Sequence, residues 1–220
     1  MGLMRFDKES LEGSVGSIYC IGRNFTEHAK ELQNPVPDKP LIFMKSAACL
    51  TPFQGQIKIG VGEQRCDYET ELAVRLGDDG FRLDAGEALR LISHIGLALD
   101  LTLRDMQKTL KSNGHPWELS KNFINSCPLS PLQPLARPED LDDLSFSLRV
   151  NGELRQSGNL QDTIFSVGDI LMYLSHHVPL RKGDLILTGT PSGVGPLRHR
   201  DVLEVSLNGK KLAEANFLIE

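Results

Sequence analysis

The sequence lacks several features that would define its class at once. None of its hydrophobic segments approaches the ~18 residues of a membrane-spanning helix. It has no surplus of basic charge, because 24 Lys and Arg stand against 29 Asp and Glu and leave a net charge of -5. Such a chain has no basic field with which to bind a phosphate backbone or an anionic membrane. We therefore expect neither nucleic acid nor a membrane as a partner.

The cysteines indicate neither a disulfide framework nor a zinc site. The four residues are scattered singly, with no Cys-x-x-Cys pair, and a chain of 220 residues does not need disulfides for stability. The N-terminus carries acidic residues where a signal peptide has its apolar segment. We therefore expect reduced thiols and a cytoplasmic protein.

The chain also has no internal repeat and no low-complexity linker, and its glycines and prolines fall between short periodic segments. Its length suits one domain, so we predict a lead-in over residues 1–16 and a single domain over 17–220. Short strands outnumber helices and do not alternate regularly with them. This pattern predicts a mixed α+β, β-rich fold of mostly antiparallel strands with a few short helices.

Periodicity and capping signals locate the elements. Capping-box patterns predict helices that begin at Asn24, Asp84 (to about residue 93) and Ser166, and a further helix spans 102–111. Two Asn-Gly pairs, at 151–152 and 208–209, predict hairpin turns. The segment 68–76 alternates and predicts a strand with one buried face. The other predicted strands are 17–21, 40–45, 56–59, 95–101, 144–150 and 184–187.

Three carboxylates form a candidate metal site. Glu69 and Glu71 project from one face of a predicted strand, roughly 6.6 Å apart along it, which suits two ligands of one hard cation. Asp100 interrupts an apolar run, so it either opens into a cleft or is buried with a partner such as Arg104 or a backbone amide. Oxygen ligands favour Mg²⁺ or Mn²⁺ over zinc. The alternative is that the two glutamates are simply solvated.

A candidate base and candidate anion-binding groups lie elsewhere. His28 and Glu31 stand three residues apart on a predicted helix, where the carboxylate can orient the ring and raise its basicity. Lys45 and Lys121 could each bind a substrate carboxylate, and the loop 188–195 could offer hydroxyl and amide groups to an anion. Each feature also has an ordinary interpretation: a surface His–Glu contact, exposed lysines, or a glycine turn.

Several short motifs occur in a fixed order along the chain. They are Gly22-Arg23-Asn24-Phe25 with His28 and Glu31, Phe43-Met44-Lys45, Glu69-Thr70-Glu71-Leu72, residues 100–107 (DLTLRDMQ), Pro116-Trp117 with Lys121, and residues 188–195 (TGTPSGVG). Taken together, they resemble the fumarylacetoacetate hydrolase family, from about Ile18 to the C-terminus, and within it the small acylpyruvase and oxaloacetate decarboxylase branch. Leu99 and Ile124 stand where the larger fumarylacetoacetate-cleaving subgroup carries Asn and Asp.

The resemblance implies a fold, partners and residue roles. The fold is a mixed β-roll, the assembly is a homodimer, and the cofactor is Mg²⁺ or Mn²⁺ held by Glu69, Glu71 and Asp100. His28 and Glu31 would activate water from a lid that orders over the substrate. Lys121 would act in catalysis beside the substrate. The implied substrate-binding residues are Arg23, Asn24, Lys45, Gln107 and Thr190.

These roles predict a divalent-metal-dependent hydrolase that cleaves the C–C bond of acylpyruvates, such as acetylpyruvate or fumarylpyruvate, to pyruvate and a carboxylic acid. The metal would chelate a small 2-keto acid and stabilise its enolate. The same site suits an alternative, an oxaloacetate decarboxylase or tautomerase, or a 2-hydroxymuconate-type isomerase or decarboxylase of aromatic catabolism. A further alternative is a non-catalytic protein that binds a metal or a small acid.

Overall fold

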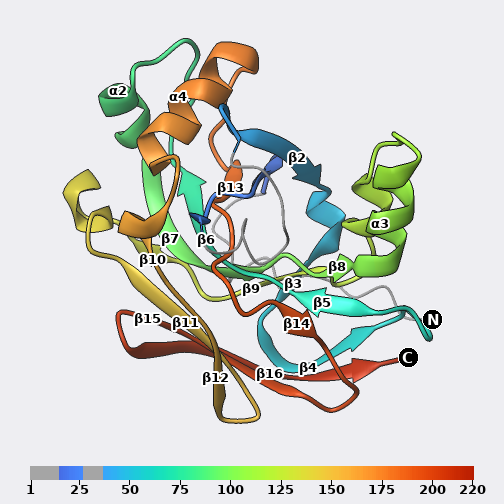
Figure 1. Cartoon of the computed structure of the whole chain (residues 1–220). Helices are drawn as coiled ribbons and strands as arrows, with labels where there is room; N and C mark the ends of the chain where they lie inside the picture. The colour runs from blue at the N-terminus through green and yellow to red at the C-terminus, as the bar shows by residue number, and fades with distance from the viewer. Residues whose placement is uncertain (1–14, 27–36) are drawn as a thin grey trace.

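Strands dominate the structure, a computed structural model that describes residues 15–26 and 37–220 (Figure 1). The largest sheet has the strand order β2-β1-β13-β6-β7-β9-β3, and β10 pairs with β7 as its eighth strand. The bounds are β1 Ile18–Gly22, β2 Leu41–Lys45, β3 Leu50–Pro52, β6 Thr70–Leu76, β7 Ile92–Leu99, β9 Cys127–Leu129, β10 Gln133–Pro134 and β13 Leu185–Leu187.

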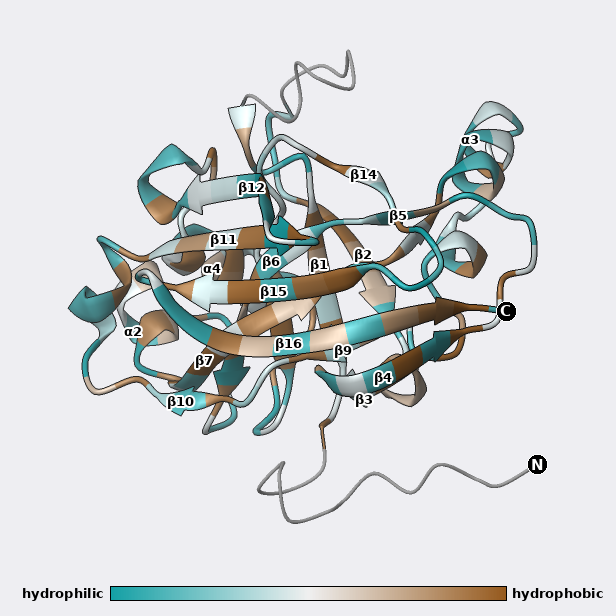
Figure 2. Ribbon diagram, turned by 90° about the horizontal axis from the view of Figure 1, so that it is seen from below, coloured by the Kyte–Doolittle hydropathy of each residue, from teal (hydrophilic) through white to brown (hydrophobic). Residues whose placement is uncertain are grey.

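A second sheet of five strands packs against the first. Its order is β12-β11-β15-β16-β4, and Figure 2 shows these strands side by side with apolar and polar residues alternating along them. β11 contacts β6 and β15 contacts β7, so the apolar face of this sheet covers one face of the larger sheet. The bounds are β4 Gln54–Ile59, β11 Ser145–Val150, β12 Glu153–Asn159, β15 Val202–Leu207 and β16 Lys210–Ile219.

Three short strands, three α-helices and four short 3-10 helices complete the described part of the chain. The strands form a small sheet in the order β14-β5-β8, with bounds Gly195–Pro196, Cys66–Tyr68 and Thr102–Leu103. The α-helices are α2 Ala85–Leu89, α3 Arg104–Ser112 and α4 Val167–His177. Helices α2 and α4 pack together, and α3 lies on the opposite side of the molecule (Figure 1). No described helix has the length and apolar character needed to cross a membrane.

The strand pairing confirms the predicted fold class. Ten of the thirteen strand pairs among the described residues are antiparallel, and the parallel ones are β1 with β13, β3 with β9 and β4 with β16. Both predicted Asn-Gly turns connect antiparallel neighbours, β11 to β12 and β15 to β16. The predicted helix caps at Asp84 and Ser166 are present at the start of α2 and α4, and both are capping boxes.

The prediction of a half-buried strand at 68–76 was wrong, because every residue of β6 is buried. One face, with Leu72 and Val74, belongs to the main core between the two sheets. The other face, with Ala73, belongs to a second apolar cluster formed with residues of β1, β2, β9 and β13. A central strand of a large sheet is covered on both sides, so polar residues at alternate positions of β6 do not face open solvent.

Several boundaries also differ from the prediction. The helix predicted over 84–93 ends at Leu89, because β7 begins at Ile92 and needs those residues for pairing with β6. The helix predicted over 102–111 starts at Arg104, since Thr102 pairs in the small sheet. The helix predicted from Asn24 lies mostly in residues 27–36, outside the described part of the chain.

Candidate active site

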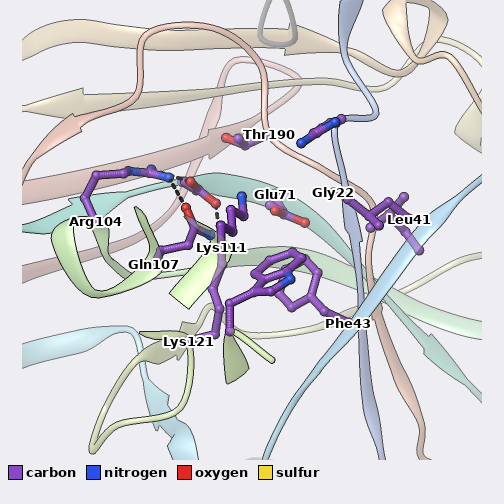
Figure 3. A pocket seen from close by; sticks show the side chains of 13 residues that line it. Gly22, Leu41, Phe43, Glu71, Arg104, Gln107, Lys111, Lys121 and Thr190 are labelled. Atoms are coloured by element: carbon purple, nitrogen blue, oxygen red, sulfur yellow. Dashed lines mark hydrogen bonds and ion pairs between the residues drawn. The ribbon is translucent and has the colours of Figure 1, made fainter. Parts of the chain in front are cut away.

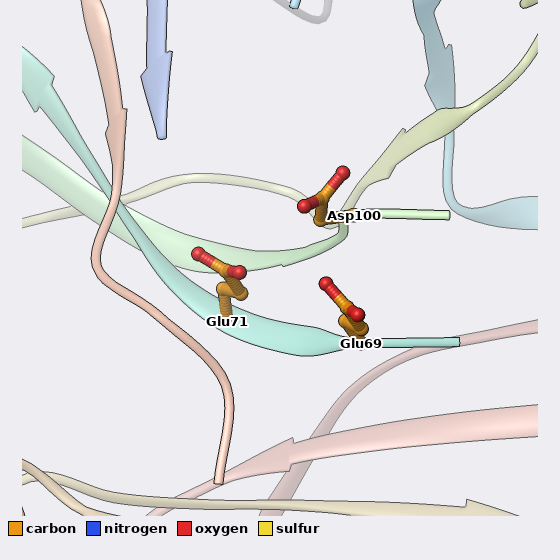
Figure 4. A group of neighbouring side chains, drawn as sticks. All are labelled: Glu69, Glu71 and Asp100. Atoms are coloured by element: carbon orange, nitrogen blue, oxygen red, sulfur yellow. The ribbon is translucent and has the colours of Figure 1, made fainter. Parts of the chain in front are cut away.

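The three predicted metal ligands come together where two neighbouring strands of the large sheet end (Figure 4). Glu71 lies in β6 opposite Ala98 of β7, Glu69 immediately precedes β6, and Asp100 immediately follows β7. One carboxylate oxygen from each of the three residues lies within 4.8 Å of the others. Antiparallel pairing therefore brings Asp100 close to two residues that lie 29 and 31 positions before it in the sequence.

Burial makes the ionised form of these carboxylates energetically unfavourable. Glu69, Glu71 and Asp100 are 6%, 2% and 0% exposed. Burial, followed by repulsion from Asp100 and Glu69, raises the pKa of Glu71 well above its ordinary value, and the hydrogen bond from the Gly189 amide opposes this only in part. Ionised carboxylates at this spacing need a compensating cation close by.

Two buried lysines supply positive charge from the protein itself. The Lys45 ammonium donates to Asp100 Oδ1 at 2.9 Å, and the Lys121 ammonium donates to Glu69 Oε2 at 2.8 Å and also to Asp100 Oδ2. Burial alone would lower the pKa of Lys121, but Asp100 and Glu69 outweigh it and raise this pKa above its ordinary value. Lysines therefore hold Asp100, where the sequence had suggested Arg104 or a backbone amide.

Arg104 instead serves the neighbouring carboxylates. It begins helix α3 and donates to Glu69 at 2.5 Å, to Asp67 at 2.9 Å and to Gln107 Oε1 at 2.9 Å. The last bond fixes the Gln107 carbonyl oxygen against Arg104 and leaves the amide nitrogen as a donor. The guanidinium therefore positions both a proposed metal ligand and a proposed substrate-binding residue.

The loop after β13 closes the site from the other side. The backbone amide of Gly189 donates to Glu71 Oε2 at 2.7 Å. Gly189 has φ +102°, and a Cβ there would lie 2.7 Å from the Cβ of Asn24. Only glycine fits both the backbone conformation and the close approach at this position.

Gln156 of β12 sets the orientation of the Thr190 hydroxyl. The Thr70 amide donates to Gln156 Oε1 at 3.0 Å, which fixes the amide group, and Gln156 Nε2 then donates to Thr190 Oγ1 at 2.8 Å. Because Thr190 Oγ1 accepts from Gln156, its own proton is available to a ligand. The sequence analysis did not identify Gln156. A polar residue in a strand with many polar residues gives no signal that it orients a hydroxyl of the site.

A small cavity of about 40 Å³ opens beside the carboxylates. Arg104, Gln107 and Lys111 reach it from α3 (Figure 3), and Thr190 faces them across it. Arg23 and Lys121 also line the cavity, as the resemblance implied. Apart from Glu69 and Glu71, the charged and polar side chains that line it can all donate hydrogen bonds, which suits an anionic ligand.

Asn24 and Lys45 lie behind the cavity wall, unlike the direct substrate contacts implied for them. The Asn24 amide nitrogen donates to the carbonyl oxygens of Thr188 at 2.8 Å and Phe165 at 3.0 Å, and its oxygen accepts from the Phe165 amide at 2.8 Å. Lys45 is 1% exposed and bonded to Asp100. Both side chains position the residues that line the cavity.

Comparisons with known proteins agree with this geometry. Residues 17–217 match the family described as fumarylacetoacetate (FAA) hydrolase, C-terminal. The chain belongs to the fumarylacetoacetate hydrolase family. It is 39% identical to the oxaloacetate tautomerase YcgM of Escherichia coli K12, with 92% of this chain and 93% of the relative covered. It is 38% identical to the mitochondrial oxaloacetate tautomerase FAHD1 of mouse, with 88% and 87% covered.

Solved structures of the family agree in fold. A fumarylpyruvate hydrolase from Pseudomonas aeruginosa, solved with Mn²⁺ and pyruvate, superposes with a TM-score of 0.88 at 32% identity, covering 94% of this chain and 91% of that one. A protein from Oleispira antarctica, named a putative fumarylacetoacetate isomerase/hydrolase, superposes with a TM-score of 0.87 at 37% identity, with 94% of each chain covered.

The carboxylate cluster of this family member fits a divalent metal. The donor set consists of three carboxylates with oxygens within 4.8 Å of one another, which matches the hard oxygen ligands that Mg²⁺ and Mn²⁺ prefer. The lysines pair with Asp100 and Glu69, whereas Glu71 accepts from the Gly189 amide, in agreement with the raised pKa of Glu71. Glu69, Glu71 and Asp100 would hold such an ion.

The predicted base lies outside the described residues. His28 and Glu31 fall within residues 27–36, so their water-activating role stays a prediction. The sequence analysis did not identify Lys111, a charged residue that lines the cavity. The signal was present: Arg104, Gln107 and Lys111 follow at intervals of three and four, which places polar side chains along one face of a helix.

Proposed function

We propose that this protein is a divalent-metal-dependent enzyme that forms the enol or enolate of a small 2-keto acid, with oxaloacetate tautomerisation or decarboxylation as its main activity. One observation carries the proposal: three buried carboxylates cluster together, and two of them, Glu69 and Glu71, line a cavity whose other polar side chains are hydrogen-bond donors. The names of the oxaloacetate tautomerases at 36–39% identity support this substrate over the acylpyruvates placed first by the sequence.

The residues of this chain divide the work of binding a 2-keto acid. A bound Mg²⁺ or Mn²⁺ would supply electrophilic stabilisation of negative charge on the 2-keto oxygen. The Thr190 hydroxyl and the Gln107 amide can donate to the substrate carboxylate, and both are held in place by hydrogen bonds to Gln156 and Arg104. The Lys121 ammonium lies beside Glu69 and Asp100, where it adds positive charge for a developing enolate.

Tautomerisation also needs a base for the C3 proton. Lys121 is a poor candidate, because its hydrogen bonds to Asp100 and Glu69 stabilise the ammonium form and raise its pKa. We assign the base to the His28 and Glu31 pair, which the sequence places on the segment between β1 and β2. Loss of CO₂ from oxaloacetate needs no such base. Removal of His28 or Glu31 should therefore impair tautomerisation more than decarboxylation.

A second candidate is acylpyruvate hydrolysis. The His-x-x-Glu spacing suits water activation, and a fumarylpyruvate hydrolase is among the solved relatives. In that reaction the water would attack the C4 carbonyl, and the pyruvate enolate would leave. The same cavity and carboxylates serve both candidates.

Turnover of a substrate panel tests the proposal. Purified protein with Mg²⁺ or Mn²⁺ would be assayed for enol–keto conversion and CO₂ loss of oxaloacetate, and for loss of acetylpyruvate, each followed by ultraviolet absorbance. We expect oxaloacetate to be the best substrate and EDTA to abolish activity. Glu71→Ala should lose activity at least about 100-fold, since it removes a metal ligand, and Glu139→Ala, at an exposed position, should keep it.

The outcomes separate the candidates. Activity unaffected by EDTA or by Glu71→Ala would sink the metal mechanism. Faster turnover of acetylpyruvate than of oxaloacetate would make hydrolysis the main reaction, and His28→Ala should then lose hydrolysis more than decarboxylation. Metal binding by calorimetry with no turnover of any 2-keto acid would instead support a non-catalytic binding protein.

A further inference from the structure

Lys111 occupies a place in the site that the proposed reaction does not explain. It lies in the last turn of α3, seven residues and roughly 10 Å along the helix axis from Arg104. Its side chain lines the same cavity as Glu69, Glu71 and Lys121. The Lys111 ammonium stands 4.5 Å from the centre of the Trp117 ring, and a cation–π contact of this kind holds the charge in one position.

Lys111 and Arg23 differ from the other cations of the site. Lys45, Lys121 and Arg104 each pair with a buried carboxylate. Among the described residues, no carboxylate pairs with Lys111 or Arg23, although both line the cavity. Arg23 also has φ +58°, a conformation that non-glycine residues rarely adopt and that tends to persist where function requires it.

The remaining charges of the site are equal in number but not all paired. Asp67, Glu69 and Asp100 pair with Lys45, Arg65, Arg104 and Lys121, whereas among the described residues Glu71 has no ion-pair partner and accepts from the Gly189 amide. A divalent ion together with Lys111 and Arg23 therefore adds net positive charge. A ligand with one carboxylate offsets only part of it, and a ligand with two offsets more.

The lowered pKa of Lys111 is consistent with a site that binds an anion. Partial desolvation, and then repulsion from Lys121, Arg23 and Arg104, lower the pKa of Lys111 to about 8. A protonated ammonium at this place is destabilised until an anion reaches it. At neutral pH most of the population still carries the proton.

We infer that Lys111, seated on Trp117 and assisted by Arg23, binds the distal carboxylate of a dicarboxylic 2-keto acid and thereby determines specificity within the proposed function. The first carboxylate of such a substrate would accept from Thr190 and Gln107, and its keto oxygen would face the ion that Glu69, Glu71 and Asp100 would hold. Lys111 would then select molecules with a second acid group over those that end in a methyl group.

A matched pair of ligands isolates this role. 2-Oxoglutarate and 2-oxopentanoate differ only in a terminal carboxylate against a methyl group, and their dissociation constants can be measured by calorimetry with Mg²⁺ present. We expect the wild-type protein to prefer 2-oxoglutarate by about tenfold or more, as for a charge-assisted hydrogen bond. Lys111→Met should remove the preference without weakening 2-oxopentanoate, and Lys111→Arg should retain it. Lys108→Met is the control, because Lys108 is an exposed lysine of α3, as Lys111 is, but does not line the cavity.

Kinetics provide a second readout. Lys111→Met should raise KM for oxaloacetate about tenfold and leave KM for acetylpyruvate, which has one carboxylate, within about twofold. Equal preference for the two ligands in the wild-type protein, or equal weakening of both in Lys111→Met, would overturn the inference. A ligand preference without turnover of oxaloacetate would leave it standing and refute the proposed function alone. Binding of neither ligand would refute the inference, and absence of oxaloacetate turnover as well would refute both.

Discussion

Among single residues, Glu71 shows most clearly how this site differs from an ordinary buried ion pair. Asp100 and Glu69 each have a lysine within hydrogen-bond distance, whereas the main partner of Glu71 is the Gly189 amide. Burial and its two acidic neighbours raise its pKa. A glutamate at such a buried position lowers the stability of the fold. Residues of this kind are typical of functional sites.

The pKa of Lys111, another single residue, predicts that ligand preference depends on pH. Its pKa of about 8 lies below that of an ordinary lysine, so the ammonium loses its proton as the pH rises from 7 to about 9.5. The other cations that face it, Lys121 and Arg104, have raised pKa values and stay charged over this range. The preference for 2-oxoglutarate over 2-oxopentanoate should therefore fall with rising pH, as measured by calorimetry across that range.

A constant preference between these pH values would contradict the prediction. The Lys111→Arg variant is the control, because an arginine keeps its proton and should show no loss of preference over the same range.

At the scale of elements, the sequence predicted what depends on local pattern. The triad was predictable because Glu69 and Glu71 have strand spacing and Asp100 stands out in an apolar run. The capping boxes of α2 and α4 and the Asn-Gly turns were equally local signals. Each of these depends on a few adjacent residues.

What depends on tertiary packing was not predictable. The burial of both faces of β6 follows from its place between β13 and β7 in the sheet. The pairing of Asp100 with Lys45 joins residues 55 positions apart, and the link from Gln156 to Thr190 joins two others 34 apart. No alternation or spacing signal reaches across such separations.

Asn24 carries the prediction at this scale, because its side chain joins three elements. It bonds to backbone groups of Phe165, before α4, and of Thr188, after β13, from the end of β1. Asn24→Ala would leave these buried groups without partners and should lower the free energy of unfolding by about 2–4 kcal/mol. Urea denaturation measures the loss.

Asn159→Ala is the matched control, since that side chain only caps a short 3-10 helix at the surface by accepting from Gln161. It should cost about 1 kcal/mol or less. Equal losses for the two variants would show that the Asn24 amide does not dock these elements.

At the scale of the whole molecule, part of the acidic excess is concentrated at one place in the fold. The net charge of -5 includes three carboxylates placed within 4.8 Å of one another at the centre of the largest sheet. These residues lie on strands β6 and β7 or directly beside them, which the five-stranded sheet covers from the other side. An ion bound there would therefore stabilise the fold as a whole and not only a loop.

Metal binding should accordingly change global stability. At a concentration 100 times the dissociation constant, Mn²⁺ should stabilise the wild-type protein by about 2.7 kcal/mol, which corresponds to a rise in Tm of roughly 5–10 °C for a chain of this size. Glu71→Gln should lose most of that rise. Without metal it should be at least as stable as the wild type, because one of three repelling charges is gone and the Gln oxygen can still accept from Gly189.

Glu139→Gln, at an exposed position, should behave as the wild type. Scanning calorimetry with Mn²⁺ and with EDTA decides the matter: an equal rise in wild type and Glu71→Gln would exclude Glu71 as a ligand, and no rise in either would exclude the metal site.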